Sequence, residues 1–223
     1  MRDLIRELGW LNGALYALDR LLRAVSHGRA RLHKYYFMAQ PVADKRWLPP
    51  SRGASVEVRQ ISASDAALKG FPRPAAVLPY RFEQGAICLG AFKAQRCIGF
   101  LWLALGPYRE DEVRCRYVPV PQGQAAWDFD VYVDPEHRAS LAFLRLWDEA
   151  NRFLAARGMR WSLSRISAFN PASISSHSRM AARRVGRAIF IALGSWQVSL
   201  SSIAPHFFLS RHADSFPVFL VHA

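Results

Sequence analysis

The chain has 223 residues, of which 51% are hydrophobic and 21% charged, a balance typical of a soluble globular protein with one or two domains. It contains no uncharged apolar run of about 18 residues, which a membrane-spanning helix requires, and acidic residues interrupt the segment where a signal peptide needs an apolar core. The net charge of +13 favours polyanionic partners, but the lack of zinc-finger spacing and of an RNA-binding aromatic motif disfavours nucleic acid.

Cysteine and histidine usage gives no sign of a disulfide framework or a metal site. Cys88, Cys97 and Cys115 are odd in number and lie in apolar or arginine-rich stretches. We expect them to be free thiols in a reducing, cytoplasmic compartment. The seven histidines show no metal-ligand spacing, so we expect no metal.

An amphipathic helix is predicted near the N-terminus, because apolar residues recur there in steps of three and four. The stripe consists of Leu4, Leu8, Leu11, Leu15, Leu18, Leu22 and Val25. We expect this stripe to dock on the chain's own domain. The alternatives are a homodimer seam and a peripheral membrane contact through residues 4–25. Residues 34–41 are predicted to form a short strand, and residues 42–54, rich in Pro, Arg and Ser, a linker.

From residue 56 the pattern changes to alternating short strands and helices. Residues 56–61 predict a strand, residues 64–69 a short helix with Ser62 or Ser64 near its N-cap, and residues 71–79 a proline-rich loop. Two strands at residues 86–92 and 97–104 are predicted to form a hairpin. The acidic loop 106–112 is predicted to be a solvated turn, with binding of a substrate amine as the alternative, and residues 113–118 are predicted to form a strand.

The central segment is a strand followed by a turn and a long helix. In residues 127–133 aromatic and aliphatic residues alternate with Asp128, Asp130 and Tyr132, which predicts one apolar face and one face with two carboxylates. After a turn at Pro135, apolar residues recur at helical spacing from Ala139 to Gly158. A strand that enters a helix through a basic turn is suited to binding an anion.

The remaining segments repeat this alternation. Residues 160–168 predict a strand, and Asn170 followed by Pro171 predicts a capped helix over residues 171–182. Strands are predicted at residues 187–193 and 196–200. The tail, residues 204–223, contains a final apolar segment at residues 216–221.

From about residue 56 to residue 201 this order of elements resembles the GNAT superfamily of N-acetyltransferases. The resemblance is carried by residues 131–138 running into the long helix, by the strand that ends at Asn170 before the next helix, and by the terminal strand pair. It implies an α/β fold with a mixed, twisted sheet. We therefore predict an N-terminal region at residues 1–54 with the helix, strand and linker, a GNAT-like domain at residues 55–203 and a C-terminal tail at residues 204–223 that packs on it.

The resemblance also implies a cofactor, acetyl-CoA or another acyl-CoA, bound at the turn after the central strand. In the family this turn usually reads Gln or Arg, two residues, Gly, one residue, then Gly or Ala, so that backbone amides approach the diphosphate. Arg138 fits the first place, but Leu141 and Phe143 occupy the glycine places, and side chains there crowd a phosphate cradle. Three interpretations remain: a rearranged coenzyme A site, a donor without the diphosphate, and loss of catalysis.

Charge bears on the choice of donor. Acyl carrier proteins are strongly acidic and present a phosphopantetheine arm, and this chain is strongly basic. The sequence also resembles, more loosely, bacterial N-acyl amino acid synthases. The predicted function is transfer of an acetyl or longer acyl group from a thioester, on coenzyme A or, as the second choice, on a carrier protein, to an amine of a small molecule or peptide. The alternative is an inactive GNAT-like module that binds an acidic partner or an anionic ligand.

Acyl transfer to an amine needs a free-base amine, a polarised thioester carbonyl and a protonated leaving thiol. Asp128 and Asp130 are the candidate bases, because a like-charge pair on one strand face raises the pKa of one member, although either could instead only pair with an arginine. The resemblance places a general acid seven residues after Asn170, at His177, where an imidazolium could protonate the thiol. A histidine hydrogen-bonded to a neighbour is the simpler alternative.

The resemblance also implies the residues that bind the cofactor. Asn170 would bind the pantetheine arm, although capping of the helix explains it equally well. The full set of predicted cofactor-binding residues is Val131, Val133, Arg138, Ala139, Ser140, Leu141, Asn170 and Ser173.

Overall fold

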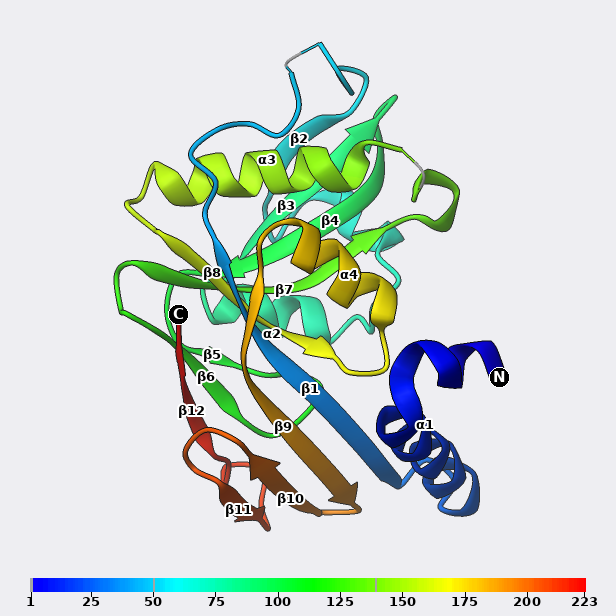
Figure 1. Ribbon diagram of the computed structural model, residues 1–223. Coiled ribbons are helices and arrows are strands. Elements are labelled where there is room, and N and C mark those ends of the chain that lie inside the picture. Colours follow the sequence, from blue (N-terminus) through cyan, green and yellow to red (C-terminus); the bar gives the residue numbers. More distant parts are fainter. Residues whose placement is uncertain (1, 50, 139) are drawn as a thin grey trace. The chain divides into compact units, whose positions relative to one another are not determined.

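The computed structural model describes residues 2–49, 51–138 and 140–223, with side chains described from residue 7 onward. Two compact units make up the chain, each formed from separate stretches of sequence (Figure 1). Unit 1 comprises Met1–Gln40, Pro107–Pro121 and Leu163–Ala223, and unit 2 comprises Pro41–Gly106 and Gln122–Ser162. The predicted α/β class is confirmed, while the predicted division at residues 54 and 203, which follows the order of the sequence, stays a prediction.

Unit 1 contains part of a large sheet, in the strand order β11-β10-β9-β1-β8, and a small sheet in the order β12-β6-β5. The strands are β1 (Ala30–Pro41), β5 (Tyr108–Arg109), β6 (Arg116–Val120), β8 (Trp161–Ser167, from residue 163 in this unit), β9 (Arg183–Leu193), β10 (Trp196–Ser201), β11 (Phe207–Ser210) and β12 (Val218–His222). Aromatic rings join the two sheets, with centroids 5.7 Å apart for Phe37 and Tyr117 and 6.1 Å apart for Phe190 and Phe219. These buried rings form the core of unit 1.

The acidic loop, residues 106–112, contributes carboxylates to a network of ion pairs and hydrogen bonds within unit 1. Glu110 is buried, and both of its carboxylate oxygens accept hydrogen bonds from Arg165 at 3.0 Å. Glu112 accepts a hydrogen bond from Tyr35 at 2.6 Å and also pairs with Arg165. Burial raises the pKa of the Tyr35 hydroxyl well above its usual value. The prediction of a solvated turn is therefore wrong for Glu110, because its cation lies 55 residues further along the chain, where local patterning gives no sign of it.

The N-terminal helix α1 (Arg2–Val25) is interrupted at Gly9, whose φ of 75° and ψ of 158° are not helical, and Figure 1 shows α1 bending. Its buried side differs from the predicted stripe. Leu8 and Asp19 are buried, whereas the side chains of Leu11 and Leu18 are 48% and 42% exposed. The predicted docking through the leucine stripe is therefore correct only in part: Leu8 is buried and Leu15 and Leu22 are half-buried, whereas Leu11, Leu18 and Val25 are exposed, and the side chain of Leu4 lies outside the described part. No helix among the described residues is long and apolar enough to cross a membrane.

Polar contacts explain which side of α1 is buried. Asp19 accepts a hydrogen bond from the backbone N–H of Leu32 at 2.8 Å. Asn12 accepts from the Lys34 ammonium at 2.7 Å and donates to the Tyr36 hydroxyl at 3.1 Å. A buried backbone N–H or ammonium needs a partner, so these polar residues of α1 turn towards β1.

Unit 2 is an antiparallel sheet in the order β7-β4-β3-β2, with α3 packed against it. Its elements are β2 (Glu57–Ile61), η1 (Ala66–Gly70), α2 (Val77–Glu83), β3 (Ile87–Lys93), β4 (Arg96–Ala104), β7 (Ala125–Val133), η2 (Pro135–His137) and α3 (Ala142–Ala155). The predicted hairpin is confirmed, and its two turn residues, Ala94 and Gln95, have φ of 47° and 68°. Positive φ at both positions matches the twist of the flanking strands.

Several predicted elements differ from the structure in type or extent. The short helix is the 3-10 helix η1, and its N-cap is Asp65, whose carboxylate accepts from the Ala67 N–H, rather than Ser62 or Ser64. The predicted proline loop gives way to α2 at Val77, because Pro79 lies in the first turn, where its missing N–H costs nothing. Strand β11 was missed within the predicted tail.

The predicted linker, residues 42–54, is fastened to α3. Asp148 accepts hydrogen bonds from the backbone N–H groups of Trp47 and Leu48 at 2.8 and 3.2 Å. Asn151 accepts from the N–H of Ala43 at 3.3 Å. These two helix residues satisfy backbone groups that secondary structure leaves without partners, so the described part of the segment, residues 42–49 and 51–54, forms a strap held to α3 by residues 43–48.

Replacing Asp148 with alanine should lower the free energy of unfolding by roughly 1–3 kcal/mol, because two backbone donors lose their acceptor. Urea denaturation measures this loss. Glu149→Ala is the matched control, since Glu149 forms an ion pair with the exposed Arg152, and the loss of such a surface pair should cost less than about 1 kcal/mol. Equal losses in the two variants would contradict the role of Asp148.

Candidate active site

Strand β7, the centre of the predicted site, contains a bulge. Opposite β4, Phe129 pairs with Trp102 and Tyr132 with Phe100, so that two β7 residues, Asp130 and Val131, face a single residue of β4. Asp130 has a φ of 50°, in the left-handed region. An extra residue ends the strict alternation of side chains, and bulges of this kind commonly redirect side chains beside active sites.

Asp128 precedes the bulge and is 1% exposed. The hydroxyl of Ser162 donates a hydrogen bond of 2.6 Å to its carboxylate, and Ser162 is itself buried. The hydrogen bond gives a buried carboxylate oxygen the partner that a buried polar atom needs. The pair forms a candidate proton-accepting group inside unit 2.

Asp130 has different partners. Arg73 donates to it from Nε at 2.8 Å and from Nη2, and Arg81 donates from Nη1. Burial would raise the pKa of Asp130, but the hydrogen bonds and positive charges of the two arginines outweigh burial, and the pKa lies below its usual value. The predicted like-charge pair with a raised pKa is therefore wrong for Asp130, which is an ion-pair anchor, the alternative left open by the sequence.

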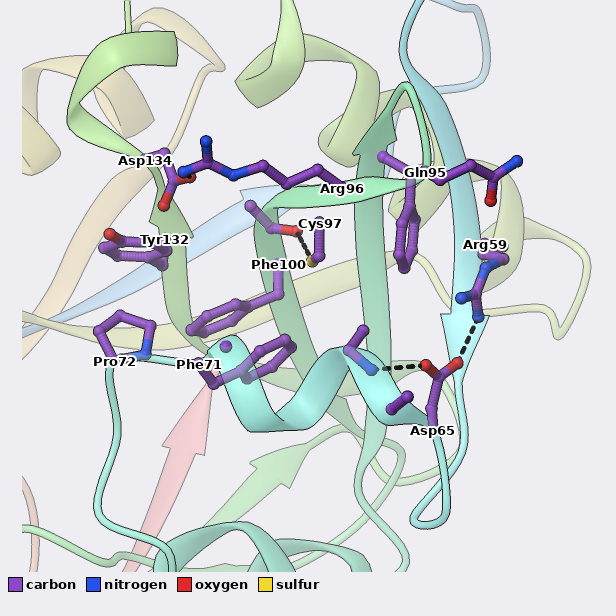
Figure 2. Close-up of a pocket in the computed structure, with 15 residues that line it drawn as sticks. Arg59, Asp65, Phe71, Pro72, Gln95, Arg96, Cys97, Phe100, Tyr132 and Asp134 are labelled. Atoms are coloured by element: carbon purple, nitrogen blue, oxygen red, sulfur yellow. Dashed lines mark hydrogen bonds and ion pairs between the residues drawn. The ribbon is translucent and has the colours of Figure 1, made fainter.

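A pocket of about 580 Å³ adjoins the end of β7 (Figure 2). Its floor is aromatic, because Phe71 stacks on Phe100 with centroids 4.1 Å apart, and Phe100 stacks on Tyr132 at 5.2 Å. The lining residues are Arg59, Asp65, Ala66, Ala67, Gly70, Phe71, Pro72, Phe92, Gln95, Arg96, Cys97, Gly99, Phe100, Tyr132 and Asp134. Phe71 and Phe100 are 8% and 1% exposed, so these rings form a packed apolar base beneath the pocket.

Two ion pairs flank these rings. Arg59 pairs with Asp65 at 2.6 Å and Arg96 with Asp134 at 3.1 Å, and Figure 2 shows the two pairs on different sides of the aromatic residues. Cys97 also lines the pocket, and burial raises the pKa of its thiol, which disfavours the reactive thiolate. The described residues contain no group of three or more His, Cys, Asp or Glu that could hold a metal ion.

The turn after β7 does not have the form of a phosphate cradle. Helix α3 begins at Ala142, three residues later than predicted, and its N-cap Leu141 provides no side-chain cap. The side chain of Leu141 lies against the backbone of Gly53, since a Cβ atom added to Gly53 would be 3.2 Å from the Leu141 Cβ. Leu141 and Phe143 stand where the family has glycines, so the described residues of this turn offer no glycine at which the backbone could approach the diphosphate of coenzyme A, and in this respect they do not fit it.

The other turn residues make local contacts. Arg138 Nε donates to the Val133 carbonyl at 3.4 Å. The hydroxyl of Ser140 donates to the His137 carbonyl and accepts from the Ala142 N–H. Ala139 was also a predicted binding residue, and it lies outside the described residues.

Helix α4 (Pro171–Arg179) carries the remaining predicted residues, in unit 1. Asn170 accepts a hydrogen bond from the Ser173 N–H at 3.0 Å, so its role as the helix cap is confirmed. His177 is buried, and its Nδ1 lies 3.2 Å from the Gln40 Oε1. Burial lowers the pKa of His177 to about 4, so its imidazole is neutral at pH 7. The predicted imidazolium acid is therefore wrong at that pH, and the hydrogen-bonded core histidine is the better description.

The structure divides the predicted site between the two units. Unit 2 holds Asp128, Asp130, Val131, Val133, Arg138, Ser140 and Leu141, and unit 1 holds Asn170, Ser173 and His177. Sequence reasoning missed Ser162, Arg73 and Arg81 as partners of the two carboxylates, and Phe71 and Phe100 as the pocket floor. Only the excess of arginine hinted at the ion pairs, because the partners are far apart in sequence.

Comparison with known proteins identifies the fold. A scan against protein-family models and a search of curated proteins find no match. Among solved structures, a tandem GNAT protein from the clavulanic acid biosynthesis pathway matches with a TM-score of 0.52 and 13% identity over 76% of this chain and 54% of that chain. A Drosophila protein matches with a TM-score of 0.52 and 18% identity, over 81% of this chain and 57% of that chain.

A third structure is described as a GNAT-family acetyltransferase from Novosphingobium aromaticivorans, with a TM-score of 0.50 and 15% identity over 72% of this chain and 65% of that chain. The chain thus spans between 54% and 65% of the length of these three proteins. At such identities the matches establish the fold, which is that of the GNAT superfamily.

The buried neutral state of His177 predicts a pH dependence of stability. Between its ordinary pKa of 6.5 and about 4, the unfolded chain takes up a proton that folded His177 does not, so stability falls as the pH falls. His177→Asn should remove on the order of 3 kcal/mol of this dependence between pH 7 and pH 4, as urea denaturation at each pH measures. His212→Asn, at an exposed histidine, should keep the dependence of the wild-type protein. An unchanged dependence in His177→Asn would contradict the assignment.

Proposed function

We propose that this chain, which has the GNAT fold, is an acyltransferase that moves an acyl group from a thioester to an amine, and that its donor is the phosphopantetheine arm of an acidic carrier protein. The GNAT fold alone gives no donor, acceptor or activity to this chain. The side chain of Leu141 carries the choice of donor, because Leu141 stands where the family has a glycine at which the backbone could approach a diphosphate.

Charge supports the same donor. The chain has 30 Lys and Arg residues and 17 Asp and Glu residues, so its net charge is +13 and its sequence pI is about 10.5. Complementary charge accelerates and orients the association of proteins. We therefore expect an acidic carrier protein to bind this chain in preference to a free coenzyme A thioester, whose diphosphate would find no binding turn at the start of α3.

The proposal gives Asp128 and Ser162 the role of proton acceptor for the attacking amine. Asp128 holds the Ser162 hydroxyl at 2.6 Å, an arrangement through which the hydroxyl can pass a proton to the carboxylate. The backbone N–H groups at Val131, within the bulge, and at Val133, after it, are proposed to hold the thioester carbonyl. The aromatic floor formed by Phe71, Phe100 and Tyr132 is proposed to receive an acyl chain longer than acetyl.

A second candidate is a binding module without catalysis. The neutral state of His177 at pH 7 favours it, because the protonated group proposed for the departing thiol is missing from that position. The two candidates differ in whether a thiol is released.

The test of function incubates the purified protein with an acylated carrier protein or with the matching acyl-CoA, in a mixture of amino acids and polyamines, and measures thiol release. We expect release from the carrier roughly tenfold or more faster than from coenzyme A, since complementary charge raises association rates by 10 to 10³. Faster release from acyl-CoA would contradict the choice of donor. No release from either would leave the binding module as the function.

With the carrier as donor, Asp128→Asn should lower turnover by about 10²-fold or more, the range for loss of a general base. The loss should shrink at high pH, where the amine is already deprotonated. Asp214→Asn is the control, because its carboxylate is exposed in unit 1. Rates equal to wild type in Asp128→Asn, with an unchanged melting temperature, would remove Asp128 from the mechanism.

A further inference from the structure

Unit 1 exposes two apolar surfaces. The first, the helix face, lies on α1 and consists of Trp10, Leu11, Leu18, Leu21 and Val25. The second, the strand face, lies on β9, β10 and β11 and consists of Ile191, Leu193, Trp196, Leu200 and Phe207. The exposed fractions of these ten residues run from 37% to 81%. Scattered exposed apolar residues need no explanation, but contiguous sets of this size mark interaction sites.

The helix face departs from the usual amphipathic arrangement, because only part of the apolar side of α1, with Leu8 buried and Leu15 and Leu22 half-buried, is covered. A surface helix normally turns its apolar stripe to the core and its polar residues to water. In α1 the polar residues Asn12 and Asp19 make the contacts to β1, while Trp10 is 81% exposed and Leu21 58% exposed. A helix built this way leaves part of its apolar side exposed.

The strand face is a single patch across three strands. Leu193 pairs with Trp196 in adjacent strands, and Leu200 pairs with Phe207, so these side chains stand next to one another on one side of the sheet. The opposite side of the same strands is covered, because Phe190 packs on Phe219 of the small sheet. One side of β9, β10 and β11 is thus core and the other is exposed and apolar.

The two faces lie on the same side of the sheet. Asn12 of α1 bonds to the side chains of Lys34 and Tyr36, which therefore point towards the helix. Lys34 is the cross-strand partner of Ile189, and directly paired residues share a face. Ile191 and Leu193 follow Ile189 in steps of two, so they lie on that face as well. Helix α1 therefore projects from this side of the sheet, next to the strand face.

We propose that a second copy of this chain covers both faces, with the helix face of each copy packed on the strand face of the other around a two-fold axis. A projecting apolar helix next to an apolar sheet surface is self-complementary, because the helix of each copy can pack on the sheet surface of the other. A two-fold interface requires such self-complementarity. A fully covered aromatic side chain buries about 150–250 Å². Ten large apolar residues that are about half exposed therefore supply on the order of the 800 Å² per partner of a stable interface.

A flat membrane fits the two faces less well. An α-helix with its side chains is about 10 Å thick, so a bilayer resting on the helix face would stand away from the strand face beside it. A helix from a second copy would cover the strand face, whereas a flat bilayer would leave the strand face uncovered. This proposal concerns unit 1 and does not rest on the acyltransferase assignment.

The test compares the mass of the full chain in solution, by light scattering during gel filtration at micromolar concentration, with that of two variants. Leu21→Glu alters the helix face and Leu193→Glu the strand face, and each should shift the wild-type dimer to monomer. Val218→Glu is the matched control, since Val218 is 43% exposed on β12, outside both faces, and should stay dimeric. Circular dichroism checks that each variant is folded.

Mixing the two monomeric variants sharpens the test. In the mixture, the intact helix face of one variant can pack on the intact strand face of the other, so dimers should partly return. A wild-type monomer, with or without binding to vesicles of anionic phospholipid, overturns the proposal. So does a dimer broken by Leu21→Glu and not by Leu193→Glu, because that result describes a seam of helix on helix.

Discussion

The candidate site depends on one carboxylate held by two guanidinium groups. Asp130 sits at the bulge of β7, where the strand loses its regular alternation, and its ion pairs with Arg73 and Arg81 fix the bulge to the segment that contains α2. Arg73 also lies over the rings of Phe100 and Tyr132, at 5.3 and 5.4 Å from their centroids. The same anchor thus sets the conformation of the strand and one wall of the pocket, and the lowered pKa of Asp130 keeps it charged over the physiological range.

A second constraint acts at the start of α3. The strap that runs from β1 to β2 is fastened along the helix by Asp148, and its Gly53 reaches the side chain of Leu141. Gly53 has a φ of +71°, a conformation that residues with a Cβ rarely adopt, so the close contact depends on glycine at this place. The described residues at the start of α3 offer apolar side chains and no glycine to a diphosphate, and that feature motivates the proposal of a donor recognised by charge and by its thioester arm.

Sequence patterns predicted the elements well where side-chain period and capping residues were local. The central strand, the hairpin at residues 93–96 and the Asn170 cap are of this kind, whereas the crowding of a phosphate turn by Leu141 stays a prediction. The patterns failed where a residue far along the chain decides the outcome. Glu110 lies in a loop with the composition of a solvated turn, and its burial depends on Arg165, 55 residues further along the chain. Backbone and ammonium groups of β1 draw Asp19 and Asn12 to the covered side of α1, which leucine spacing does not reveal.

The central claim is that the start of α3 contributes nothing to binding a diphosphate. Isothermal titration of the purified protein with coenzyme A and with pantetheine, which lacks the phosphates and the adenosine, measures this contribution directly. The account predicts dissociation constants for the two ligands that agree within about tenfold, a difference of about 1.4 kcal/mol. A dissociation constant for coenzyme A lower than that of pantetheine by about 10³ or more, with the difference retained at high salt, would contradict it.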